Sequence, residues 1–136
     1  MFESVLFCMA TAVYWEARNQ DFSGQLAVLK VVENRTHHPA FPNDPCDVIT
    51  QGPLAGKWPI RNQCQFSFYC DGKSDEMVDS KAKHEAITVA VLQLSGIFPD
   101  NTNGAIFYHA DYVTPWWARL MGYTTTIQNH IFYKDK

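Results

Sequence analysis

The stretch from residue 2 to residue 18, FESVLFCMATAVYWEAR, most constrains the fold of this chain. Its apolar residues recur at three- and four-residue intervals, which predicts an α-helix with one apolar stripe. Glu16 follows the last residue of that stripe by three positions, so its carboxyl group is expected on the buried face. The stripe consists of Phe2, Val5, Leu6, Met9, Ala12 and Val13.

The inward position of Glu16 allows two interpretations. Burial disfavours the charged form of a carboxylic acid, so the pKa rises, and an acid that keeps its proton near neutral pH can serve as a general acid. Alternatively, Glu16 forms a buried ion pair with an arginine and serves only the architecture. The spacing does not decide between them. The candidate partners are Arg18, Arg35 and Arg119.

Length and composition bound the class of protein. With 136 residues, of which 46% are apolar, the chain suits one compact domain spanning residues 1–136, and we expect a monomer. The net charge of −3 and the lack of a basic run argue against nucleic-acid binding. The apolar run over residues 5–15 is too short for stable membrane insertion and lacks the flanks of a signal peptide. A target outside the cytoplasm would then be reached by another route, such as cell lysis.

The four cysteines do not have the paired spacing of a zinc ribbon or a redox motif. Any two of Cys46, Cys64 and Cys70 could form a disulfide across the loop-rich middle of the chain in an oxidising compartment. Equally, these three and Cys8 could remain reduced, buried thiols.

Periodicity and cap residues predict the other elements of a mainly helical α+β fold. Helices are expected over residues 25–35, 46–51 and 80–95, with Asp21 or Ser23, Asp44, and Asp79 or Ser80 as N-caps. Residues 65–69 alternate and predict a short strand or an ordered loop. Strands are expected over residues 105–109 and 124–133, forming an antiparallel pair. In the second strand, Ile127, Ile131 and Tyr133 should face one way, and Thr126, Gln128 and His130 should form a polar face.

Six short motifs in a fixed order resemble the SleB-type cell-wall hydrolases, the catalytic domains of spore-cortex-lytic enzymes, which have bacterial and phage relatives. The resemblance spans residues 10–133. The motifs are Tyr14-Trp15-Glu16-Ala17-Arg18, Gly24-Gln25-Leu26-Ala27-Val28, Val32-Glu33-Asn34-Arg35, Gln65-Phe66-Ser67, Thr102-Asn103-Gly104-Ala105 with Tyr108-His109, and His130-Ile131-Phe132-Tyr133.

The resemblance implies a lysozyme-like fold with a small antiparallel β-element beside a cleft, and cleavage of peptidoglycan glycan strands without a cofactor. It implies Glu16 as the catalytic acid and Tyr108 as a second catalytic residue. SleB is similar to lytic transglycosylases, which cleave after N-acetylmuramic acid and leave a 1,6-anhydro ring. One glutamic acid can suffice there, first as acid and then as base. Many relatives carry a separate wall-binding domain, so affinity here is expected from the cleft itself. A phage endolysin, released by lysis, would fit this picture.

Substrate contacts are expected from two regions. Gln65 and Ser67 flank Phe66 and project to one side of an extended segment, although a polar edge strand has the same pattern. Residues 107–133 are rich in aromatic rings, which can stack on sugar faces. Of the adjacent Trp116 and Trp117, one is expected in the core and one near substrate. The predicted substrate-binding residues are Gln65, Phe66, Ser67, His109, Trp116, Trp117 and His130.

Three other functions remain open from the sequence. A muramidase on the same fold would use water in place of the sugar's 6-hydroxyl group. A zinc-dependent amidase would use His109, His130 and Glu16 as ligands, although no HExxH-type spacing supports it and histidines more often bond to backbone or carboxylate. The third possibility is a wall-binding module without catalysis.

Overall fold

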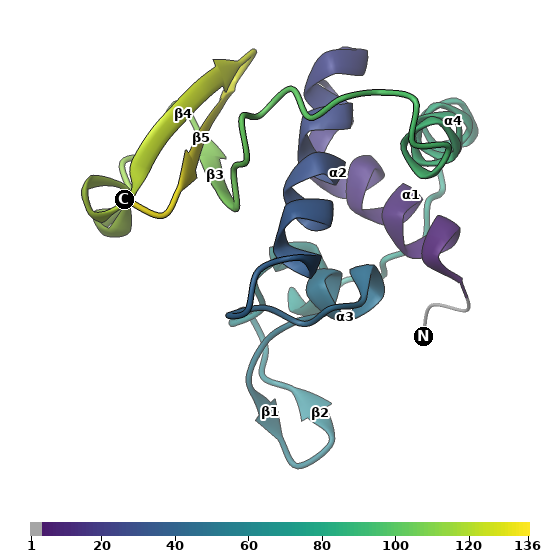
Figure 1. Ribbon diagram of the computed structural model, residues 1–136. Coiled ribbons are helices and arrows are strands. Elements are labelled where there is room, and N and C mark those ends of the chain that lie inside the picture. The colour runs from purple at the N-terminus through teal and green to yellow at the C-terminus, as the bar shows by residue number, and fades with distance from the viewer. Residues whose placement is uncertain (1–3) are drawn as a thin grey trace.

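The computed structural model describes residues 4–136 and shows a helical body with a small β-sheet beside it (Figure 1). The sheet is antiparallel in the order β3-β5-β4. This arrangement confirms the predicted mainly helical α+β class. The helices are α1 (Val5–Ala17), α2 (Phe22–Thr36), α3 (Pro45–Ile49) and α4 (Ser80–Leu94), and the strands of the sheet are β3 (Phe107–Ala110), β4 (Gly122–Ile127) and β5 (His130–Lys134).

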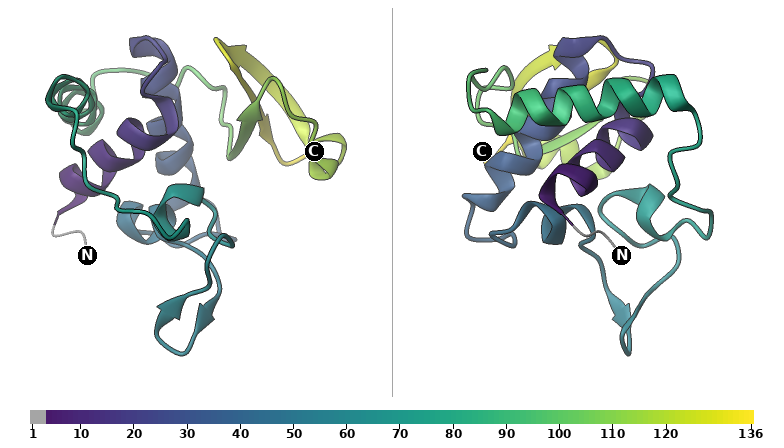
Figure 2. Two further views of the ribbon diagram at one scale, coloured as in Figure 1. Left: turned by 180° about the vertical axis from the view of Figure 1, so that it is seen from behind. Right: turned by 90° about the vertical axis from the view of Figure 1, so that its right-hand side faces the viewer.

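Helix α1 runs through the centre of the helical body and packs against α2, α3 and α4 (Figure 2). Ser4 caps its start by accepting a hydrogen bond from the Phe7 N–H. The predicted single stripe was too narrow, because three helices cover α1 and bury it on most sides. Phe2, which belongs to the predicted stripe, lies outside the described residues. The buried residues of α1 are Cys8, Met9, Ala10, Thr11, Ala12, Val13, Tyr14 and Ala17.

The turn between α1 and α2 is also where the sheet touches the helical body. Asp21 caps α2, so the helix begins at Phe22, three residues earlier than predicted. The Asp21 N–H donates to Gln128 Oε1 across 2.7 Å, which holds the tip of the β4–β5 hairpin on this turn. A Cβ atom at Gly24 would lie 2.5 Å from the same oxygen. Glycine at position 24 therefore permits this close approach.

Two side chains of α2 hold the segment that leads from α4 into β3. Asn34 Nδ2 donates to the Ala105 carbonyl at 2.9 Å, and Arg35 Nε donates to the Ile106 carbonyl at 2.7 Å. A small core of Ala27, Val31, Ala105 and Phe132 lies between helix and sheet. The chain reaches this point by crossing α2 from α4 (Figure 1).

Residues 124–133, predicted as one strand, form parts of two strands joined by a tight turn at Gln128 and Asn129. Gln128 has a φ of 50°, a left-handed conformation that reverses the chain. The predicted faces are also wrong, because His130 and Phe132 are buried whereas Ile131 and Tyr133 are partly exposed. The alternation of polar and apolar residues continues through the turn, so the sequence pattern did not indicate that a turn lies there.

The segment between α2 and α4 contains short elements. Asp44 caps α3, as predicted, and the helix begins at Pro45, one residue before the expected range, and ends at Ile49, two residues before its expected end. Asp79 caps α4, which ends within one residue of the predicted position. Residues 65–69 do not form a strand, because the chain enters a 3₁₀ helix there. The remaining elements are η1 (Ser67–Cys70), η2 (Trp116–Leu120), and a hairpin of β1 (Leu54–Ala55) and β2 (Trp58–Pro59) that projects from the body (Figure 1).

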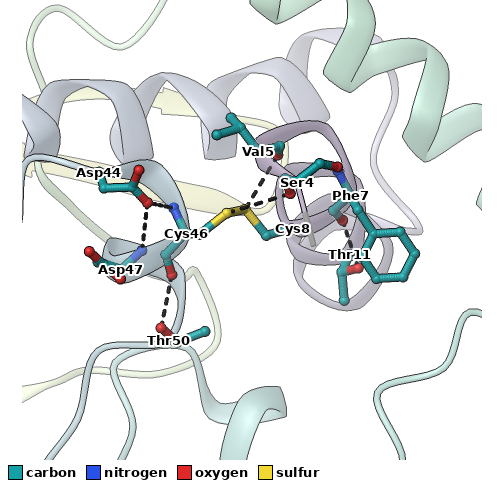
Figure 3. Close-up of a disulfide and its surroundings, with 9 residues drawn as sticks. All are labelled: Ser4, Val5, Phe7, Cys8, Thr11, Asp44, Cys46, Asp47 and Thr50. Carbon is teal, nitrogen blue, oxygen red and sulfur yellow. Dashed lines mark hydrogen bonds between the residues drawn. A yellow bond between two sulfur atoms is a disulfide. The ribbon is translucent and has the colours of Figure 1, made fainter. Parts of the chain in front are cut away.

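All four cysteines are paired. Cys8 of α1 bonds Cys46 of α3 (Figure 3), and Cys64 bonds Cys70. The sequence allowed the second pair but not the first, because Cys8 lies in an apolar helical pattern and resembles an ordinary core residue. The Cys64–Cys70 bond closes the short loop that carries Gln65 and Phe66. Within residues 4–136, no helix combines the length and the hydropathy needed to cross a bilayer.

Candidate active site

Two adjoining hollows meet at Glu16 and form one groove between the end of α1 and the sheet. Their volumes are about 360 and 580 Å³. We call the first the amide half, because Asn19, Gln20 and Asn129 line it together with Tyr14, Ala17 and Arg18. The second is the aromatic half, lined by Arg35, Gln65, Phe66, Phe107, Tyr108, His109, Val113 and Trp117. Both halves share Trp15, Glu16, Ala110, Tyr112 and His130.

Glu16 lies in the last turn of α1, so its side chain extends from the helix end into the middle of the groove. Burial raises the pKa of Glu16 above its ordinary value. A hydrogen bond from Tyr108 and the positive charge of Arg35 both lower the pKa, but burial has the larger effect. Glu16 therefore keeps its proton at pH values where an ordinary glutamic acid has lost it.

The interpretation of Glu16 as a structural ion pair is wrong. Among residues 4–136 the ion pairs are Lys30–Glu33 and His38–Asp135, and Glu16 makes none. Of the three candidate arginines, Arg35 acts on Glu16 through space, Arg18 stacks on Tyr14, and Arg119 is exposed. The carboxyl group is thus not paired with an arginine.

Tyr108, on β3, is the direct partner of Glu16. Its hydroxyl group donates to Glu16 Oε1 across 2.5 Å. Its ring packs against His130 and Phe132, which fixes its position. Burial and the neighbouring carboxyl group raise the pKa of Tyr108 well above its ordinary value, so this hydroxyl remains a donor. The other oxygen of Glu16 is left for a ligand.

Arg35 lies behind Glu16 with only 4% of its surface exposed. Its guanidinium group lies between the rings of Phe41, Phe66 and Phe107, at 4.8 to 5.6 Å from their centres. Burial lowers the pKa of Arg35 to about 10, so it remains charged at neutral pH. Its Nη1 atom is buried and has no hydrogen-bond partner among the described residues. A fixed positive charge therefore lies close to Glu16.

The two histidines of the groove differ. Burial lowers the pKa of His130, which keeps this ring neutral beside Glu16. His109 Nδ1 donates to the Ala110 carbonyl at 2.7 Å, and Nε2 shares a hydrogen bond with the Tyr133 hydroxyl at 2.8 Å. Both nitrogens of His109 are thus occupied. Over residues 4–136, no three side chains of the metal-binding types are gathered closely enough to hold an ion.

Most of the predicted substrate-binding residues lie in the groove. Gln65, Phe66, His109, Trp117 and His130 line it. Ser67 and Trp116 do not, and their role as substrate contacts stays a prediction.

The expectation that one of Trp116 and Trp117 is in the core is wrong, because no residue of η2 is buried. Trp116 is 73% exposed, whereas Trp117 packs on the rings of Phe107, His109 and Tyr133.

Sequence reasoning did not assign several other groove residues to the site, among them Trp15, Arg18, Arg35 and Tyr112. Trp15 and Arg18 share the last helical turns with Glu16, and that proximity was the available signal. Trp15 is held by a hydrogen bond from its indole nitrogen to the Asp75 carbonyl at 2.9 Å. Arg35 and Tyr112 come from distant segments, and only the fold brings them here.

Comparisons with known proteins identify relatives of this chain. A family model described as cell wall hydrolase matches residues 19–133, a range that does not include Glu16. The chain is 33% identical over 125 residues to a spore cortex-lytic enzyme of Halalkalibacterium halodurans and 31% identical over 126 residues to that of Bacillus subtilis, covering 91% of this chain in each case. The chain spans about a third of the length of these relatives, covering 33% and 35% of them.

Two solved structures are also similar. The catalytic domain of the germination-specific lytic transglycosylase SleB from Bacillus anthracis superposes with a TM-score of 0.70 at 28% identity, covering 98% of this chain and 97% of that one. The catalytic domain of SleB from Bacillus cereus superposes with a TM-score of 0.67 at 30% identity, covering 96% of this chain and 89% of that one. The fold is therefore that of the SleB catalytic domains. The chain belongs to the cell wall hydrolase family.

Proposed function

We propose that this chain cleaves peptidoglycan glycan strands between N-acetylmuramic acid and N-acetylglucosamine as a lytic transglycosylase. Glu16 serves as the general acid and then as the general base. The relatives named as spore cortex-lytic enzymes and the solved lytic transglycosylase domains support this class of reaction. The assignment of Glu16 itself rests on the geometry of the groove.

The observation that carries the proposal is that Glu16 is the only carboxylic acid among the residues lining the groove, within the described part of the chain. Glycosidases that act through two carboxyl groups hold them roughly 5 to 9.5 Å apart on either side of the scissile bond. A groove with one acid favours a reaction in which the substrate supplies the nucleophile.

In the first step, protonated Glu16 donates its proton to the glycosidic oxygen as the bond from this oxygen to the anomeric carbon breaks. Tyr108 holds Oε1 and so directs the second oxygen towards the sugar. The carboxylate that forms is stabilised by the Tyr108 hydroxyl and by the charge of Arg35. These groups thus act on the ionised state of Glu16.

In the second step, the Glu16 carboxylate accepts the proton of the substrate's 6-hydroxyl group as this oxygen attacks the anomeric carbon. The attack closes the 1,6-anhydro ring and returns the proton to Glu16. Every proton removed in one step is restored in the other, so the enzyme ends as it began.

Mass spectrometry of digested cell walls tests the proposal. The expected products are muropeptides lighter by one water than hydrolytic fragments. Reducing ends would instead indicate a muramidase, and free stem peptides would indicate an amidase.

A matched pair of variants tests the role of Glu16. Glu16→Gln should lower the rate at least about 100-fold, because the amide cannot exchange the proton. Glu85→Gln, on an exposed position of α4, should retain the rate of the wild type. Equal activity of the two variants would show that Glu16 is not the acid.

A further inference from the structure

Arg18 is a charged residue in the amide half with hydrogen-bond donors to spare. It is exposed, lines this half of the groove, and follows the end of α1. Among the described residues it makes no ion pair, and its one hydrogen bond runs from Nε to the Tyr14 carbonyl at 3.4 Å. The two terminal nitrogens of the guanidinium group are therefore open to a ligand.

The guanidinium group of Arg18 has a rigid support. It lies 3.8 Å from the centre of the Tyr14 ring and 5.3 Å from that of Trp15. Tyr14 is 1% exposed, and its hydroxyl group accepts a hydrogen bond from the Asp79 N–H at 3.0 Å. Stacking on a fixed ring reduces the conformational freedom that Arg18 would lose on binding a ligand.

The surroundings of Arg18 suit an anion. Apart from Glu16, no acid lines the amide half within residues 4–136, and Asn19, Gln20 and Asn129 add neutral amides. The aromatic half is lined instead by aromatic rings and by the buried Arg35. The two sides of Glu16 are therefore chemically different, as are the two sugars of the strand.

N-acetylmuramic acid differs from N-acetylglucosamine by a lactyl ether that carries a carboxylate or, through it, a peptide stem. We propose that Arg18 binds a carboxylate on this lactyl arm, so that the muramoyl residue lies in the amide half and its neighbour in the aromatic half. A planar guanidinium group pairs with a carboxylate through two parallel hydrogen bonds. This inference rests on the proposed function, which it extends to the direction of the strand in the groove.

Binding to catalytically silenced protein tests the inference separately from cleavage. In the Glu16→Gln background, affinity is measured by calorimetry for three tetrasaccharides: one with free lactyl carboxylates, one with dipeptide stems, and neutral chitotetraose. Arg18→Gln should weaken the binding of an acidic tetrasaccharide about five- to ten-fold, and the affinity for chitotetraose should stay the same. About 1 M salt should remove the difference. Arg119→Gln, which removes an exposed charge outside the groove, is the control.

Each possible result either supports the inference or overturns it. A loss confined to the free-lactyl ligand assigns Arg18 to that group, and a loss confined to the stem-bearing ligand assigns it to the peptide. Three results would overturn the inference. In the first, Arg18→Gln loses as much affinity for chitotetraose as for the acidic ligands; in the second, it loses no affinity for either acidic ligand; in the third, the parent protein binds neither acidic ligand. Failure of the wild type to cleave walls would refute the proposed function without changing these affinities.

Discussion

At the scale of single residues, Glu16 is influenced in opposite directions by its surroundings. Burial favours the protonated acid, whereas Tyr108 and Arg35 favour the carboxylate. A catalyst that gives and then takes a proton needs both forms within reach. The sequence predicted the inward position of Glu16 from a three-residue spacing and gave Arg35 as one of three candidate partners. It could not single out Arg35, whose Nε donates to the Ile106 carbonyl 71 positions away.

Tyr108→Phe should move the basic limb of the pH–rate profile to higher pH. The variant lacks the hydrogen bond that lowers the pKa of Glu16, so the acid form persists further into the alkaline range. The rate at the optimum should fall about ten-fold, the value of one charge-assisted hydrogen bond. Measuring kcat/KM between pH 4 and 9 checks both effects. A limb that stays in place would show that Tyr108 does not act on Glu16.

Glu16→Gln should become more stable, relative to the wild type, as pH rises. The pKa of Glu16 is raised in the folded state, so ionisation disfavours the fold once pH exceeds the ordinary value of 4.5, until the raised pKa is passed. Glutamine has no such titration. Urea unfolding of both proteins at pH 4 and pH 8 gives the comparison. A difference in unfolding free energy that is independent of pH would contradict the raised pKa.

At the scale of elements, the sequence predicted the helices better than the sheet. Asp44 and Asp79 are local signals, so α3 and α4 begin within one residue of the expected positions. The β4–β5 hairpin was missed because its turn uses Gln128 and Asn129 rather than glycine, and Gln128 is held by a contact with Asp21 that no local pattern shows. The groove depends on this hairpin, so its shape could not be predicted.

Gly24→Ala should destabilise the protein by about 1 to 3 kcal/mol. Alanine in a helix is ordinarily more stable than glycine by about 1 kcal/mol. Here the added methyl group would lie 2.5 Å from Gln128 Oε1 and 2.7 Å from Gln20 Cβ, so both side chains must shift, and the hydrogen bond from the Asp21 N–H to Gln128 Oε1 is disturbed. Thermal unfolding and KM are measured for Gly24→Ala and for the wild type. Gln128→Ala in the same chain should recover part of the loss, and a stabilised Gly24→Ala protein would contradict the close contact.

At the scale of the whole molecule, the two disulfides have different roles. Cys8–Cys46 spans 38 positions and joins α1 to α3, whereas Cys64–Cys70 spans 6 and encloses one wall of the groove. Replacing the first pair by alanine should lower the free energy of unfolding by about 4 kcal/mol, and the second by about 2 kcal/mol. Urea unfolding under oxidising conditions measures both.

The activities of the two disulfide variants should also differ. Loss of Cys64–Cys70 should raise KM more than loss of Cys8–Cys46, because Gln65 and Phe66 line the groove. The opposite order would show that the short loop keeps its shape without the bond.

Three of the bonds that hold the groove together run from helix side chains to main-chain carbonyls: Trp15 to Asp75, Asn34 to Ala105, and Arg35 to Ile106. Every amino acid offers the same carbonyl, so positions 75, 105 and 106 can mutate without losing the acceptor, whereas the three donors cannot. Evolutionary drift should therefore be uneven across this interface, with slow exchange on the helices and faster exchange at Asp75, the partly exposed acceptor.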